Sequence, residues 1–414
     1  MSDSPTFRWR SIALPVLLPS LLFAIGEGAV IPVIATVAAN QGAGLALAGL
    51  IAAALTLGEL VGNLPSGWLI AKIGERRTMI GAGVLGLLSV LLCSVSTHPF
   101  VLGLGILLLG VAASAFALAR HAFLTSFVPH SHRARALSTL GGTFRLGFMI
   151  GPFVTAAVIA LTGLAENAFW IAAAGCVAAI LVLLFLPDPA STFGVVSGSR
   201  TAQRATAAQQ QTPQIGVFRT IRDRRRVLLT VGLGAAGLSA LRSSRQVILP
   251  LWALSIGVAD STTALVIGIA GGVDFALFYL GGALMDRFGR LSTALPAMLG
   301  LGAGHVVLAL THDLTAATAW FVFAAMLLAF SNGVSSGILM TLGADLADQK
   351  NPAPFLGAWR LTTNIGGSTA PLLLSGITAI ASISIAAASM GVVALVGTAL
   401  LAWFLPRNGA SSTP

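Results

Sequence analysis

The chain has 414 residues, of which 56% are hydrophobic and only 9% are charged, whereas charged residues make up about 25% of a typical soluble domain. Its mean hydropathy is +0.92. The 23 basic and 13 acidic side chains are too few to cover a water-exposed surface, which excludes a soluble globular enzyme, a disordered protein and a secreted disulfide scaffold. The formal net charge of +10 comes from Arg and Lys in short stretches between apolar segments. This placement is typical of membrane loops, not of a nucleic-acid-binding surface.

Twelve apolar stretches are long enough to cross a bilayer, which takes about 20 residues in a helix. They are continuous apolar runs, whereas barrel strands alternate apolar and polar residues. The sequence therefore predicts an all-α membrane protein with twelve transmembrane helices. The expected spans are 12–36, 46–70, 78–97, 100–120, 136–161, 168–187, 227–252, 262–285, 292–311, 315–344, 355–379 and 383–406.

The loops between these spans indicate an orientation. Every second loop carries Arg or Lys, whereas the intervening loops carry none and hold only Glu166, Asp260 and Asp313. Basic residues are retained on the cytoplasmic side of a membrane. We therefore expect a multi-pass protein of the plasma membrane, in bacteria the inner membrane, with both termini in the cytoplasm.

The sequence repeats itself at an offset of 215 residues. Glu59 corresponds to Asp274 and Arg145 to Arg360, and each half ends on Phe-Leu-Pro. A constant offset across several motifs predicts two six-helix bundles in parallel orientation, over 1–187 and 227–414, joined by a cytoplasmic linker at 188–226. Such a duplication, with a site at the interface of the repeats, is typical of secondary transporters.

Two loops carry related versions of one motif, after the second and the eighth predicted spans. Glycines allow a tight turn and close helix approach, and arginines hold a loop at an anionic membrane surface. The carboxyl group of Asp286 could accept hydrogen bonds from a helix N-terminus, whereas its repeat equivalent is Ala71. The motif residues are Gly67, Gly74, Arg76, Arg77, Gly282, Asp286, Arg287, Gly289 and Arg290.

These loops resemble the cytoplasmic motif of the major facilitator superfamily (MFS), and the helix number, duplication and central linker agree with that family. The resemblance implies two bundles that rock about a central cavity, and a contact of Asp286 that bridges the halves and latches one state. Gly147, Gly151 and Pro152 resemble part of the motif of the family's antiporters, with Thr155 and Ala156 where glycines are usual. Bacterial drug:proton antiporters are the members to which the chain is most similar.

Charges inside the membrane are costly and usually mark function. The deep ones are three acids, Glu27, Glu59 and Asp274, and three arginines, of which Arg145 lies in the fifth predicted span and Arg242 and Arg245 lie in the seventh. All lie on spans that line the central cavity of the family. The proton-coupling candidates are Glu27, Glu59 and Asp274.

The basic and amide candidates leave alternatives open. Arg242 and Arg245 could bind cargo or pair with Glu27 or Asp274. We expect Arg145 and Arg360, near helix ends, to serve as gate or snorkelling residues. Asn332 and Asn364 could donate to a substrate or bond between helices.

We therefore expect a secondary active transporter, with no cofactor and no metal site. Its partners are a small-molecule substrate, protons or sodium ions, and the lipid bilayer, and we expect a monomer. The leading interpretation is proton-coupled efflux of a drug or metabolite. The alternative is uptake or export of a small anionic solute that Arg242 and Arg245 bind. A membrane-embedded enzyme or a receptor is disfavoured, because the sequence has no catalytic constellation and no ligand-sized soluble domain. The Gly-x-Ser-x-Gly run at 333–337 lies in a membrane span and not in a strand-turn-helix elbow.

Overall fold

The computed structural model describes residues 16–128, 130–186, 217–348 and 352–408, and all regular structure in these ranges is helical. The predicted all-α architecture is confirmed. Of the expected linker at 188–226, residues 188–216 lie outside the described part of the chain. The first half comprises α2 (Leu18–Val30), η2 (Ile31–Val33), α3 (Ile34–Asn40), α4 (Leu45–Ile73), α5 (Glu75–Ser94), α6 (Pro99–Phe127), α7 (His130–Thr162), η3 (Ala165–Asn167) and α8 (Ala168–Phe185).

The second half begins with short helices at the end of the expected linker. It comprises α11 (Val217–Asp223), α12 (Arg225–Val227), η4 (Leu228–Gly232), α13 (Leu233–Ser255), α14 (Asp260–Phe288), α15 (Arg290–Thr311), α16 (Ala317–Val334), α17 (Ile338–Leu346), α18 (Ala353–Ile380), α19 (Ile383–Phe404) and η5 (Pro406–Asn408). Eleven stretches of the described residues are long and apolar enough to cross a membrane, and the expected span 355–379 is α18.

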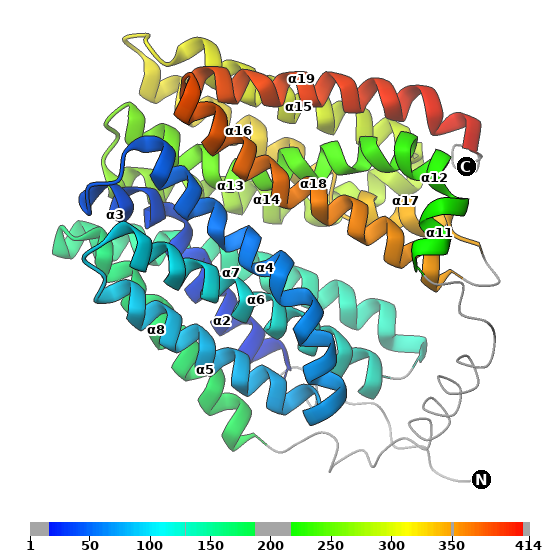
Figure 1. The fold of residues 1–414 in the computed structure, drawn as a ribbon, viewed down its shortest axis with the longest axis horizontal. Helices are drawn as coiled ribbons and strands as arrows, with labels where there is room; N and C mark the ends of the chain where they lie inside the picture. The colour runs from blue at the N-terminus through cyan, green and yellow to red at the C-terminus, as the bar shows by residue number, and fades with distance from the viewer. Residues whose placement is uncertain (1–15, 129, 187–216, 349–351, 409–414) are drawn as a thin grey trace.

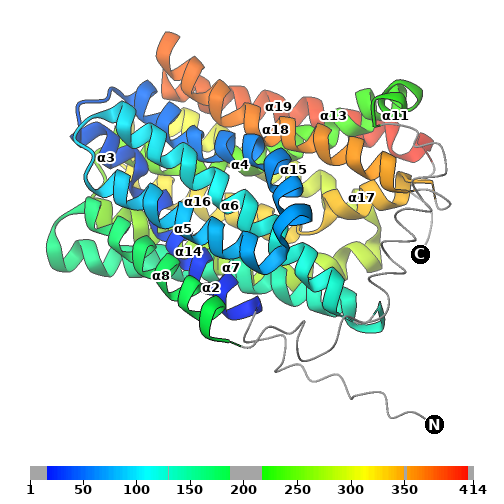
Figure 2. The same cartoon turned by 60° about the horizontal axis from the view of Figure 1, so that its bottom comes forward.

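The two halves pack in the same way. In the first half α2 packs on α7 and α8, α4 on α6, and α5 on α8. The equivalent helices of the second half repeat each of these pairs, since α13 packs on α18 and α19, α14 on α16, and α15 on α19. Figure 1 shows the result as two bundles lying side by side, one coloured blue to green and the other green to red. Figure 2 shows the same helices after a rotation of 60°.

One end of the molecule is closed by contacts between the bundles. We call the end where α2 begins and α19 ends the termini side, and the other end the opposite side (Figure 1). On the opposite side Thr36 Oγ1 donates a hydrogen bond to Asp260 Oδ1 over 2.8 Å, from one half to the other. Gly49 of α4 faces the side chains of Leu251 and Ser375 of the second half.

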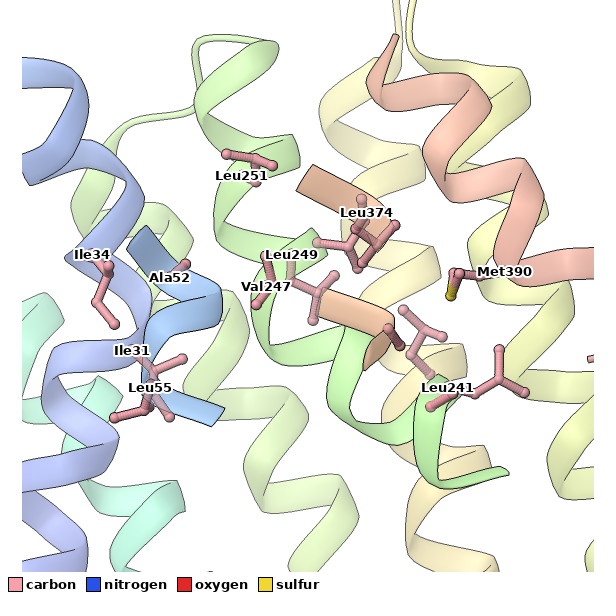
Figure 3. Close-up of a cluster of buried hydrophobic side chains, with 14 of the residues drawn as sticks. Ile31, Ile34, Ala52, Leu55, Leu241, Val247, Leu249, Leu251, Leu374 and Met390 are labelled. Atoms are coloured by element: carbon pink, nitrogen blue, oxygen red, sulfur yellow. The ribbon is translucent and has the colours of Figure 1, made fainter. Parts of the chain in front are cut away.

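The apolar core continues from one bundle into the other. Figure 3 shows Ile34 and Ala52 of the first half, with Leu251 and Leu374 of the second half in the same cluster of buried side chains. Membrane helices associate by close van der Waals packing, so this cluster fastens the bundles where they meet. Helices α7 and α14, and α4 and α18, form the two main contacts between the halves.

Candidate functional site: a two-chamber cavity between the bundles

A cavity of about 310 Å³ lies between the two bundles, in the middle of the molecule. Its walls come from α2, η2 and α7 of the first half and from α13, α14 and α16 of the second half. We call it the arginine chamber, because three of its four charged lining residues are arginines. Its lining includes Ile31, Phe144, Arg145, Phe148, Pro152, Arg242, Ser243, Arg245, Leu249, Ile267, Asp274 and Asn332.

Asp274 is the centre of the hydrogen bonds in this chamber. Its Oδ1 accepts from Arg145 Nη1 at 2.7 Å, and its Oδ2 accepts from Asn332 Nδ2 at 2.9 Å. Arg245 Nη2 lies 3.5 Å from the same Oδ2. Arg145 also donates to Ser336 Oγ at 2.8 Å and lies over the ring of Phe278. Because α7 and α14 belong to different halves, the Arg145–Asp274 ion pair bridges the two bundles.

Arg242 differs from the other two arginines, because its hydrogen-bond acceptors in the described structure are neutral oxygens. Its Nε donates to Asn332 Oδ1 at 2.9 Å, and its Nη2 lies 3.4 Å from the Asn332 carbonyl oxygen and 3.3 Å from that of Ser335. These carbonyls lie where the helix breaks between α16 and α17, and Gly337 at the break has a φ of +82°. Non-helical backbone at membrane depth is tolerated where it lines a cavity.

A second cavity, of about 290 Å³, adjoins the first on its termini side. Phe144 and Ser243 line both cavities. We call it the glutamate chamber. Its lining includes Glu27, Thr56, Glu59, Asn63, Ser114, Arg120, Ser239, Arg360, Asn364 and Ser368. Asn364 therefore lies in the second chamber and Asn332 in the first.

Glu27 and Glu59 face the glutamate chamber without a fixed partner. Neither carboxyl group forms a hydrogen bond or ion pair with any residue that the structure describes, although Glu27 is only 4% exposed. Of the alternatives left open for Arg242 and Arg245, no ion pair with Glu27 is found among the described residues, whereas Arg245 lies within ion-pair distance of Asp274. Positions related by the internal repeat correspond in sequence, but this correspondence does not bring them into contact.

Arg120 belongs to the site and is absent from the sequence-based candidates. It is buried, its Nε has no hydrogen-bond partner in the described structure, and its guanidinium carbon lies 4.3 Å from the centroid of the Phe144 ring. Arg120 is also close enough to Glu27 to interact with it electrostatically. The expected span ended at residue 120, whereas α6 continues to Phe127 and carries Arg120 well inside the helix. The sequence signal that indicates a longer helix here is the further apolar turn that follows the charged residue.

Arg145 lies deeper than the sequence suggested. The expected span began at residue 136, but α7 begins at His130, so Arg145 is near the middle of a helix of 33 residues. It lines the arginine chamber instead of a helix end. The polar stretch at the start of α7 resembles a loop in composition, and this is why the helix start was misplaced.

The two related loop motifs form the same turn. Gly74 separates α4 from α5 with a φ of +84°, and Gly289 separates α14 from α15 with a φ of +87°. Only glycine adopts this backbone conformation without strain. By contrast, Gly67 and Gly282 have open space or ordinary contact where a side chain would extend.

The charged residues of these motifs make contacts within their own halves. Arg76 donates to carbonyl oxygens of Leu183 and Leu186 at the end of α8, and Arg290 Nε donates to Asp345 Oδ2 over 2.8 Å. Arg287 lies over Phe288, and Arg77 is exposed. Asp286 is exposed, and among the described residues it has no hydrogen bond, so the latch implied by the resemblance stays a prediction.

The antiporter-like glycines pack α7 against α2. A side chain on Gly147 would collide with Ala24, and one on Gly151 would collide with the backbone near Gly28 and Ala29. Thr155, which stands where a glycine is usual, donates its hydroxyl to the carbonyl oxygen of Ala29 at 2.8 Å. Pro152 lines the arginine chamber one residue after Gly151.

Comparison with known proteins agrees with this arrangement. The family described as Major Facilitator Superfamily matches residues 16–354 and 246–414. A triacylglyceride transporter of Mycobacteroides abscessus is 35% identical over 126 residues, which are 28% of this chain and 23% of the relative. A gallate transporter of Pseudomonas putida is 28% identical over 178 residues, which are 42% of this chain and 36% of the relative. These matches span well under half of either relative.

Solved structures share the fold over nearly the whole chain. A POT family transporter in complex with a thioalcohol-conjugated peptide has a TM-score of 0.76 at 13% identity, and the match covers 96% of both chains. A D-xylose–proton symporter has a TM-score of 0.74 at 15% identity, and the match covers 98% of this chain and 99% of the symporter. The predicted fold of two six-helix bundles is confirmed. The chain belongs to the Major Facilitator Superfamily and is a multi-pass membrane protein.

Proposed function

We propose that this transporter moves a small organic anion, bound in the arginine chamber, together with a proton exchanged in the glutamate chamber. The observation that carries the proposal is the charge of the first chamber. Arg145, Arg242 and Arg245 face a single carboxylate, Asp274, and Arg242 bonds only to neutral oxygens. An arginine presents a planar fork of donors that matches a carboxylate.

The same charge argues against a cationic drug as the main cargo. Charges of one sign at a binding surface select partners of the opposite sign and penalise like charge. An organic cation in the arginine chamber would meet two positive charges that Asp274 does not neutralise. This charge supports the anionic alternative, and it argues against a cationic drug as the cargo of the efflux interpretation.

The other walls of the arginine chamber favour an anion with an apolar or aromatic body. Phe144, Phe148, Ile31, Leu249 and Ile267 line it, and a cavity of about 310 Å³ is at the small end for ligand sites. The relative named as a gallate transporter suggests an aromatic carboxylate as a probe. A triacylglyceride, the named cargo of another relative, is uncharged and does not match the arginines.

The glutamate chamber supports proton coupling. Glu27 and Glu59 have no fixed partner among the described residues, so a proton can bind or leave without breaking a contact. Both face a cavity that shares the lining residues Phe144 and Ser243 with the solute chamber. Arg120 lines the same chamber and supplies a positive charge there.

We place the termini side in the cytoplasm of a bacterial inner membrane, because the basic residues lie in loops of that side. The closed opposite side and the glutamate chamber nearer the termini side then correspond to a conformation open to the cytoplasm. We also expect a monomer, because the cavity is complete within one chain.

Transport into proteoliposomes tests the proposal. Radiolabelled gallate would be followed with a pH gradient of either polarity, with a sodium gradient, and without a gradient. We expect gallate to accumulate under one pH polarity, and unlabelled small carboxylates to compete while organic cations do not. Transport of organic cations, with no carboxylate competing, would contradict the anion proposal. Accumulation driven only by sodium would contradict proton coupling.

A further inference from the structure

The ion pair that bridges the bundles has a counterpart in the internal repeat. Asp274 of α14 corresponds to Glu59 of α4, and Arg145 of α7 corresponds to Arg360 of α18, both at the offset of 215 residues. The packing of α7 on α14 likewise corresponds to that of α18 on α4. The repeat thus places an acid and an arginine at both contacts between the halves.

The two pairs are in different states in this conformation. Arg145 and Asp274 form a bond of 2.7 Å, with side chains 22% and 12% exposed. Glu59 and Arg360 line the same chamber, but no bond joins them. Helices α4 and α18 meet on the opposite side, at Gly49 and Ser375. The glutamate chamber holds them apart nearer the termini side.

We propose that Glu59 and Arg360 form the second bridging ion pair when the termini side closes. Rocking of the bundles brings together the halves of α4 and α18 that now flank the glutamate chamber, and these two side chains project into that chamber from the two helices. The bonded pair between α7 and α14 shows the geometry that the repeat provides. Arg360 is then a positioning residue of the transport cycle. Its side chain is exposed here because the termini side is open in this conformation.

The pair makes closure of the termini side depend on protonation, a consequence that rests on the proposed role of Glu59 in proton exchange. A protonated Glu59 is neutral and gains little from Arg360, whereas the carboxylate gains an ion pair shielded from water. The other charged groups facing Glu59 are Glu27 from α2 and Arg120 from α6. They are on the first half, as is Glu59, so they remain with it when the second half moves.

Distances between spin labels test this pair without any solute. Labels at Lys72 of α4 and Gly357 of α18, both exposed, would report closure of the termini side by pulsed electron paramagnetic resonance. In the otherwise unchanged protein we expect the closed fraction to rise from acidic to alkaline pH. Glu59→Gln and Arg360→Gln should each lower the closed fraction at alkaline pH by about threefold or more and remove its dependence on pH.

Two further variants separate the pair from a general effect on folding. Arg360→Lys should retain most of the closed fraction, and the double reversal Glu59→Arg with Arg360→Glu should restore closure. Thr369→Ala, at an exposed position of α18 that lines neither chamber, is the control and should change nothing. The proposal is wrong if no closed population exists at either pH, if its rise with pH persists in Arg360→Gln, or if folded Arg360→Lys loses closure as fully as Arg360→Gln. These outcomes do not depend on which solute is carried, so they are distinct from a failure of the anion proposal.

Discussion

Asp274 is the residue whose loss should cost the most stability. It compensates Arg145 and Arg245 and accepts from Asn332. Removing one member of a buried pair leaves an unpaired charge, at a cost of about 3 kcal/mol. We expect Asp274→Asn to lower the melting temperature of the detergent-solubilised protein, and Arg145→Gln in the same chain to recover most of the loss. A double variant no more stable than Asp274→Asn would show that the pair is not a unit.

Arg242 should behave in the opposite way, because it has no carboxylate partner in the described structure. Arg242→Lys keeps the charge but loses the planar fork that reaches Asn332 and an anion together. We expect solute transport to fall by about tenfold or more, equivalent to about 1.4 kcal/mol, while the melting temperature changes little. A loss of stability as large as that of Asp274→Asn would instead make Arg242 a structural residue.

Variants of the two unpaired acids should separate proton coupling from solute exchange. Glu27→Gln and Glu59→Gln mimic a permanently protonated side chain. At the coupling position this change should abolish accumulation driven by a pH gradient and leave counterflow exchange partly active. Accumulation and counterflow would be measured on the same proteoliposomes. If both single variants still concentrate the solute, neither acid carries the proton.

At the scale of elements, the contact of α7 with α2 depends on glycine. A methyl group at Gly151 would meet backbone atoms of α2, and overpacking typically costs about 1–3 kcal/mol. Gly151→Ala should therefore lower the melting temperature. Gly81→Ala is the matched control, because no atom lies within 4 Å of the position that its side chain would take. Equal effects of the two substitutions would contradict the packing explanation.

The turn between α14 and α15 carries the gating prediction. Asp286 lies at the termini-side end of α14 and is exposed, and we expect its latch to form when the termini side closes. A carboxylate at a helix N-terminus contributes about 0.3–1 kcal/mol, and up to about 2 when partly buried. Asp286→Asn should shift the equilibrium several-fold toward the conformation open on the termini side, and Ala71→Asp should shift it the other way.

Spin labels on the termini-side ends of α7 and α14 would measure this shift. An unchanged distance distribution in Asp286→Asn would reduce this residue to a turn cap. The labels differ from those on α4 and α18, so the latch and the Glu59–Arg360 pair can fail independently.

The sequence predicted elements better than contacts. Long apolar runs and the offset of 215 residues gave the twelve spans and the pairing of equivalent helices, because burial in lipid leaves few alternatives to helices. Helix ends were less predictable where charges lie inside a helix. Arg120 and Arg145 were assigned to helix ends for this reason, although α6 and α7 carry them inside the bundle.

The partners of the buried charges could not be predicted, because they depend on a break in one helix. The carbonyl oxygens that accept hydrogen bonds from Arg242 lie at the break where α16 ends and α17 begins. The Gly-x-Ser-x-Gly run at 333–337 marks that break, but in sequence it resembles a nucleophile motif. Its small residues here open the backbone toward the cavity.

At the scale of the whole molecule, the two chambers between the halves differ in charge. The arginine chamber carries two uncompensated positive charges, whereas the glutamate chamber balances Glu27 and Glu59 against Arg120 and Arg360. Solute and proton are thus assigned to neighbouring parts of one cavity. Rocking of the bundles about the core of Figure 3 would change the access of both together.

The central claim is that the cavity selects anions, and thermal stabilisation of the purified protein by a solute panel tests it most directly. A ligand that binds only the folded protein stabilises it by RT ln(1 + [L]/Kd), so no transport direction or driving ion needs to be known. We predict that small organic carboxylates raise the melting temperature, that their uncharged amides and organic cations do not, and that the shift is lost in Arg242→Gln. Stabilisation by cations or neutral lipophiles, or a carboxylate shift that survives in Arg242→Gln, would contradict the account.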